Sequence, residues 1–152
     1  MVFGYGNPGR QDDGIGPLIA ERVEAERLPG VSVESACQLN IEDAATAAEH
    51  DVVLFVDASQ SGPEPFELKR LVPAEEIAFT THCLPPEAVL AICEDHFSAT
   101  PQGWVLGVRG YEFEFEEGLS AQAEHNCEQA LNFVLSWLQR GGKTEWIKMQ
   151  AG

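Results

Sequence analysis

Residues Phe3–Gly16 read FGYGNPGRQDDGIG. An apolar strand end runs into a glycine-rich turn, and two adjacent aspartates, Asp12 and Asp13, follow just before a helix begins. A glycine turn between a strand and a helix usually binds phosphate, because exposed backbone N–H groups and a helix N-terminus attract anions. Two carboxylates would repel a phosphate at this place. The stretch therefore favours a cation over an anion as its ligand.

Composition indicates a single domain that spans residues 1–152. The chain has 152 residues, of which 44% are hydrophobic, and this is enough for one compact core. Its formal net charge is -16, from 25 acidic and 9 basic side chains. This charge argues against binding to nucleic acid, which needs clustered lysine and arginine, and against binding to anionic membranes. It either favours a basic partner or serves only solubility.

The cysteines indicate a reducing compartment. Cys37, Cys83, Cys93 and Cys127 lie far apart and form no Cys-x-x-Cys pair. Structural zinc normally uses such pairs, and disulfide scaffolds are shorter and richer in cysteine. The first residues carry no signal-peptide pattern, and no apolar stretch approaches the roughly 20 residues that span a bilayer. We therefore expect a cytoplasmic protein with reduced thiols and no membrane association.

Strand-like and helix-like segments alternate along the chain. Apolar runs and alternation predict strands at Met1–Tyr5, Val31–Ala36, Val52–Val56, Phe66–Val72 and Trp104–Val108. Helical spacing of apolar residues predicts four helices: one from Ile15 to Pro29-Gly30, one capped by Asn40, one opening at Pro85-Pro86, and one from a cap at Ser120 to Gly141-Gly142. The second helix is expected to turn inward its apolar residues Ile41, Ala44, Ala45 and Ala48.

This alternation predicts a three-layer α/β/α sandwich. Its sheet is expected to be twisted and mostly parallel, with about five strands. Val52–Val56 is apolar at every position, which is typical of a central strand buried on both faces. Phe66–Val72 follows a proline-interrupted loop and is expected at an edge, antiparallel to its neighbour. In such sheets, ligands bind outside the carboxyl ends of the strands.

Polar side chains from three segments of the chain are expected at that edge of the sheet. Asp57 ends an apolar strand, where a carboxylate must be solvated, paired or bound to a cation unless it only caps the next turn. The Asp12-Asp13 pair follows the first strand, although acidic residues there would also suit a first helical turn. His82 lies in a loop just before a helix. Two carboxylates and one imidazole are a sensible ligand set for a first-row divalent metal.

An acidic segment follows the last predicted strand. Glu112, Glu114 and Glu116 alternate with Phe113 and Phe115. This alternation predicts an extended segment with one acidic face. The segment is either a solvated edge or a contact surface for a basic peptide.

The combination resembles the nickel-iron hydrogenase maturation endopeptidases. The motifs that carry the resemblance are Gly4-x-Gly6-Asn7, Asp12-Asp13-Gly14-x-Gly16, Asp57 after an apolar strand, and His82 before a helix. The order of elements matches across nearly the whole chain. Members of this family remove a C-terminal extension from the hydrogenase large subunit after nickel insertion. The resemblance implies a large-subunit precursor as partner, nickel carried by that substrate, no organic cofactor, and a monomeric protease.

The resemblance also assigns roles to single residues. It implies that Asp13, Asp57 and His82 contact the metal and carry catalysis, while Asp12 shapes the turn. Another divalent metal could occupy the same side chains in a crystal. Gln38 lies where some relatives have a glycine-rich turn, and Gln38 and Asn7 are therefore candidates for substrate contact. The attacking water would be activated either by nickel or by one of the aspartates.

Three other functions fit parts of the sequence. A peptidase of similar fold could use the two aspartates without any metal. Gly4-x-Gly6-x-x-Gly9 satisfies a dinucleotide-binding fingerprint, although Pro8 and the acidic pair oppose pyrophosphate. Gly6-Asn7-Pro8-Gly9 resembles the opening of peptidyl-tRNA hydrolases, which have a catalytic histidine soon after the turn and a basic surface. Here the first histidine is His50 and the net charge is -16, so this last function is disfavoured.

Overall fold

The computed structural model describes residues 1–76 and 84–141, and strands alternate with helices along them. The elements in chain order are β1 (Val2–Tyr5), the 3-10 helix η1 (Pro8–Gly14), α1 (Ile15–Ala25), β2 (Val33–Ala36), α2 (Glu42–Ala47), β3 (Val52–Ser59), β4 (Phe66–Arg70), α3 (Pro86–Phe97), β5 (Gln102–Arg109) and α4 (Ala121–Gln139). None of these helices combines the length and the apolar composition that a bilayer crossing needs. Gly142, expected at the end of the last helix, lies outside the described residues.

Five strands in the described part of the chain form one sheet, in the order β2-β1-β3-β5-β4. The β1–β2, β1–β3 and β3–β5 pairs are parallel, and β4 runs antiparallel to β5 at the edge. The predicted mostly parallel sheet with one antiparallel edge strand is therefore confirmed. The carboxyl ends of β2, β1, β3 and β5 all lie at the same edge of the sheet, and this edge carries the candidate site.

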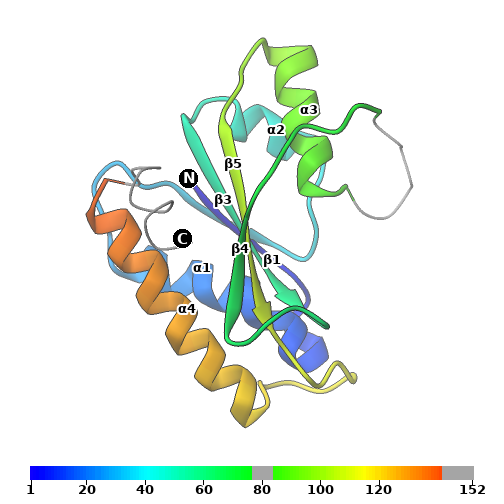
Figure 1. Cartoon of the computed structure of the whole chain (residues 1–152), viewed down its shortest axis with the longest axis vertical. Coiled ribbons are helices and arrows are strands. Elements are labelled where there is room, and N and C mark those ends of the chain that lie inside the picture. Colours follow the sequence, from blue (N-terminus) through cyan, green and yellow to red (C-terminus); the bar gives the residue numbers. More distant parts are fainter. Residues whose placement is uncertain (77–83, 142–152) are drawn as a thin grey trace.

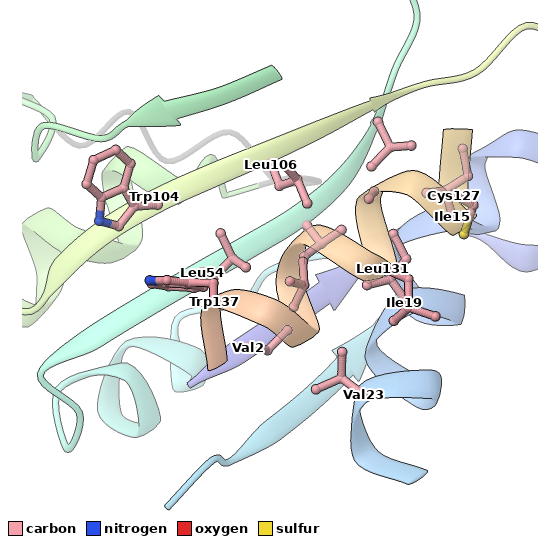
Figure 2. Close-up of a cluster of buried hydrophobic side chains, with 14 of the residues drawn as sticks. Val2, Ile15, Ile19, Val23, Leu54, Trp104, Leu106, Cys127, Leu131 and Trp137 are labelled. Carbon is pink, nitrogen blue, oxygen red and sulfur yellow. The ribbon is translucent and has the colours of Figure 1, made fainter. Parts of the chain in front are cut away.

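Helices cover both faces of the sheet, as predicted (Figure 1). On one face, α1 and α4 pack on the strands, and Figure 2 shows Trp137 of α4 beside Leu54 and Leu131 of α4 beside Ile19 of α1. On the other face, α2 and α3 cover a second cluster that contains Phe55. β3 has buried side chains on both faces because it lies in the middle of the sheet, which explains its unbroken apolar run.

The strand bounds differ from the predicted ones, chiefly at β3. This strand was expected to end before Asp57, but it continues to Ser59. The reason is its neighbour: Asp57, Ala58 and Ser59 pair in register with residues 107–109 of β5. Asp57 is thus held by the sheet ladder instead of standing in a loop.

The predicted start of α2 is wrong, and its predicted inner face is right only in part, since Ala44 is buried and Ala48 packs half-buried on the core. Ile41 occupies the N-cap position and no side chain caps the helix; instead, the Asn40 N–H donates to the Asp43 carboxylate at 2.7 Å. Ala44 and Ala47 are buried, whereas Ile41 and Ala45 are exposed. The helix is only six residues long, so helical periodicity had too few positions to fix its rotation.

Candidate active site at the carboxyl edge of the sheet

The turn that follows β1 is folded by local hydrogen bonds. The Asn7 side chain caps η1 by accepting the Gly9 N–H at 2.9 Å, and Pro8 occupies the first helical position. The Asn7 N–H donates to Oδ2 of Asp13 at 2.8 Å. Gly6 has a φ of 144°, which side-chain-bearing residues rarely adopt. These contacts fix the half-buried Asp13 carboxylate above the end of β1.

Glycine at position 16 lets the helix lie directly on the sheet. A methyl group on Gly16 would collide with the carbonyl oxygens of Tyr5 and Val56, which belong to two neighbouring strands. The first turn of α1 therefore approaches the backbone of both strands as closely as the chain allows. The glycines thus fix the backbone in place and bring Asp13 next to the end of β3.

Asp57 occupies the carboxyl end of β3 in a half-buried position. Its Oδ1 accepts the Ala58 N–H at 2.8 Å. The pKa of the Asp57 carboxyl is raised to about 6, chiefly by burial and also by the negative charge of Asp13, while hydrogen bonds from the Ala58 N–H and the Tyr5 side chain act in the opposite direction. Asp57 consequently holds a proton at mildly acidic pH and loses it just below neutrality.

The structure brings Asp13 and Asp57 together, from a turn and a strand 44 positions apart in the chain. The 3-10 helix η1, which carries Asp13, packs against β3, and the charge of Asp13 contributes to the raised pKa of Asp57. Two carboxylates with different surroundings can share a metal ion or divide the roles of acid and base. Within residues 1–76 and 84–141 they have no third ligating side chain beside them. His82, the predicted third member, lies outside the described residues.

The two candidate substrate contacts lie at the same edge of the sheet. Gln38 is exposed and follows β2, whose last residue, Ala36, accepts the Gly6 N–H at 3.1 Å. Asn7 is exposed as well, and its side-chain oxygen is engaged in capping η1. Both positions are accessible to a bound peptide, and their role stays a prediction.

Asp12 has a different environment from its neighbour. Its side chain is fully buried and accepts four hydrogen bonds. Burial alone would raise the pKa of the Asp12 carboxyl, but the bonds from Glu112, Tyr111 and Ser120 outweigh it and leave the pKa below its ordinary value. Asp12 therefore stays ionised inside the protein, and it shapes the turn as expected.

The loop between β5 and α4 is a part of the site that the sequence did not reveal. Residues 110–120 were expected to include an extended acidic segment; instead, they bend across η1. The Asp12 N–H donates to the Glu112 carbonyl at 3.0 Å and the Gln11 N–H to the Glu116 carbonyl at 2.8 Å. In Figure 1 this loop lies at the end of the sheet to which the parallel strands point.

Tyr5 is a second component of the site that sequence reasoning missed. Its side chain hydrogen-bonds to Asp57. The alternation of side chains along neighbouring strands could have predicted this contact. Phe3 pairs with Phe55, so Tyr5 and Asp57, two positions further along each strand, lie on the same face of the sheet.

Comparisons with known proteins agree with this geometry. No family model matches the sequence, and no curated protein sequence matches it. Solved structures do match. The [NiFe] hydrogenase maturation protease HycI from Thermococcus kodakarensis KOD1 has a TM-score of 0.72 and 25% identity, over 91% of this chain and 90% of that chain. The hydrogenase maturating endopeptidase HybD from E. coli has a TM-score of 0.68 and 27% identity, over 93% and 92%.

These similarities first define the class of protein, which is a peptidase. A further match, the endopeptidase HycI from Escherichia coli, has a TM-score of 0.68 and, at 23% identity over 90% of this chain and 89% of that chain, supports the fold alone. More particularly, the structural neighbours of this chain are hydrogenase maturation proteases. The resemblance inferred from the glycine turn and its aspartates is thereby confirmed.

Proposed function

We propose that this protein is a cytoplasmic, monomeric endopeptidase that removes the C-terminal extension of a nickel-iron hydrogenase large-subunit precursor after nickel insertion. The observation that carries the proposal is the pairing of Asp13 and Asp57 at the carboxyl edge of a sheet whose structural neighbours are maturation proteases. Carboxylates at this edge suit a cationic recognition element better than an anionic one.

In this proposal, the nickel carried by the substrate is bound by Asp13, Asp57 and His82. The enzyme then has no need of a resident metal or of an organic cofactor. Gln38 and Asn7 contact the substrate chain beside the metal. Cleavage proceeds by attack of a water molecule, activated by the nickel or by one of the two aspartates, on the carbonyl carbon of the scissile bond.

One observation favours a second candidate, a metal-independent aspartate peptidase. The raised pKa of Asp57 beside the charged Asp13 is what a carboxylate pair needs if one member is to act as a general base near neutral pH. Nickel-loaded and nickel-free precursors separate the two candidates. Equal cleavage of both would favour the metal-independent enzyme, and cleavage of the loaded form alone supports nickel recognition.

The decisive experiment follows loss of the C-terminal peptide from a nickel-loaded precursor. Asp13→Asn and His82→Gln are expected to fold and to process the precursor poorly. Asp95→Asn and His96→Gln are matched controls, because they change the same residue types at exposed positions of α3. Full activity of both site variants would rule out the proposed function.

A further inference from the structure

We propose that Asp12 is a positioning residue for Asp13, and that it acts by tying the turn after β1 to the loop of residues 110–120. The inference rests on the proposed function, in which Asp13 contacts the metal. Asp12 itself is fully buried, so it cannot touch substrate or metal. Any effect of Asp12 on the reaction is therefore exerted through the residues that it contacts or adjoins.

The tie consists of four hydrogen bonds across about a hundred positions of sequence. Oδ2 of Asp12 accepts the Tyr111 N–H at 2.7 Å, the Glu112 N–H at 3.0 Å and the Ser120 hydroxyl at 2.8 Å, while Oδ1 accepts the Ser120 N–H at 2.8 Å. Ser120 is also the N-cap of α4. The carboxylate is therefore placed at a helix N-terminus, where negative charge is favoured.

The residues before Asp12 strengthen the same connection. Gln11 has φ 48° and ψ -115°, a conformation that is strained for any residue except glycine. Its side chain accepts the Glu114 N–H at 3.0 Å, and the Arg10 guanidinium donates to the Phe113 carbonyl at 3.2 Å. A strained backbone conformation persists only where surrounding contacts hold it in place. Here the hydrogen bonds to the 110–120 loop are those contacts.

Asp13 takes its place from this anchored backbone. It follows Asp12 directly, and its Cα lies about 3.8 Å from that of Asp12 across the peptide bond. On its other side, the Asp13 carbonyl lies where a side chain of residue 6 would be, and its carboxylate accepts the Asn7 N–H. A shift of Asp12 out of its four bonds would therefore carry Asp13 away from Asp57.

Asparagine cannot replace Asp12 in this role. All four bonds are donated to the carboxylate, and an amide would turn its own N–H₂ group toward one of these donors. Asp12→Asn keeps the volume of the side chain but breaks at least one bond and adds a repulsive contact. This substitution therefore tests the hydrogen bonds between Asp12 and the 110–120 loop without changing the packing around the side chain.

A double-mutant cycle with Asp13 tests the proposal. Cleavage of the nickel-loaded precursor is measured for the wild type, Asp12→Asn, Asp13→Ala and the double variant, at a temperature where all four are folded. Asp12→Asn is expected to lower kcat by about 10²-fold and to raise KM, because the displaced Asp13 both carries catalysis and binds the nickel of the substrate. In the Asp13→Ala background, it should produce no further loss. An equal loss in both backgrounds would overturn the proposal.

Two further variants distinguish positioning from stability. Val134→Ala removes volume from a fully buried position of α4, so it lowers stability without touching the turn, and kcat should be unchanged. Ser120→Ala removes one donor to Asp12 and should lower kcat, whereas Ser120→Thr keeps the hydroxyl and should restore it. If Val134→Ala lowers kcat as Asp12→Asn does, Asp12 has only a structural role.

A crystal structure of Asp12→Asn gives an answer that does not depend on activity. We expect the Asp13 carboxylate to be displaced and its bond from the Asn7 N–H to be lost, relative to the wild type in the same crystal form. An unmoved Asp13 would contradict the proposal. A wild type that cleaves no precursor would instead defeat the proposed function, and the crystallographic result would still decide the role of Asp12.

Discussion

Two regions of this molecule each bury an aspartate, and the pKa of the carboxyl group is shifted in opposite directions in the two places. Asp12 lies under the 110–120 loop with four donors around its carboxylate, and its pKa is lowered. Asp57 lies at the end of β3 with fewer donors and the charge of Asp13 nearby, and its pKa rises to about 6. The supply of hydrogen-bond donors, more than burial, decides which carboxylate is structural and which is available for chemistry.

The sharpest test of this contrast is the loss of activity in Asp57→Asn. Asparagine keeps the shape of the side chain but removes the negative charge and the basic oxygen. We expect kcat/KM for the nickel-loaded precursor to fall by about 10³-fold, with the folded structure retained. Circular dichroism checks the fold, and Asp95→Asn serves as the exposed control. Retention of most of the activity would place the chemistry elsewhere.

The next largest effect is the loss of stability in Asp12→Asn. Four donors lose their charged acceptor inside the protein, and we expect the free energy of unfolding to fall by about 3 kcal/mol. Urea titration at pH 7 measures the change. Asp13→Asn is the control, since its half-buried carboxylate accepts one bond and its replacement should matter less. Equal effects of the two substitutions would remove the contrast between these neighbours.

The pH dependence of stability should show the opposite signs of the two carboxylates. Between pH 4 and 6 the unfolded chain has released the proton of Asp57 while the folded protein keeps it, so this residue makes the free energy of unfolding fall as pH rises. We expect Asp57→Asn to remove a decline of about 2 kcal/mol across this window. Asp12 contributes stability above its unfolded pKa, and this contribution is lost as pH falls. Urea midpoints measured from pH 4 to 7 test the sign for Asp57, and midpoints measured below pH 4 test the sign for Asp12.

The smallest expected effect is that of Ser120→Ala. The hydroxyl of Ser120 donates to Asp12 at 2.8 Å and accepts the Ala123 N–H at 3.3 Å as the cap of α4. Its loss leaves the other three bonds to Asp12 in place, and we expect a destabilisation of about 1 kcal/mol. Thermal unfolding measures it. A loss as large as that of Asp12→Asn would mean that the hydroxyl carries the whole tie.

The sequence predicts most of the fold because the signals are local. The unbroken apolar run at Val52–Val56 marks a central strand, and Ser120 marks the start of α4, where it acts as the N-cap. The end of β3 is set by pairing with β5, so the last three residues of the strand, 57–59, could not be predicted from the apolar run. The rotation of the short α2 is likewise decided by packing and not by periodicity.

The candidate site was predictable in part for the same reason. Asp13 follows the end of β1 and Asp57 lies near the carboxyl end of the neighbouring β3, and the parallel topology brings these ends to the same edge of the sheet. The four hydrogen bonds to Asp12 come from donors about a hundred positions away in the sequence, and no local sequence pattern predicts such contacts. The acidic alternation after β5 predicted an extended segment, because it contains no sign of the turn against which the segment folds.

The distance along the chain between Asp12 and its donors has a consequence for the order in which the protein is made. The turn is among the first parts of the chain to be synthesised, whereas Tyr111 and Ser120 follow only after every strand of the sheet. Closing such a long loop is slow compared with forming a helix. A growing chain that ends before residue 111 lacks all four donors. If Asp12 positions Asp13 as proposed, the site reaches its working geometry only when the start of α4 has docked.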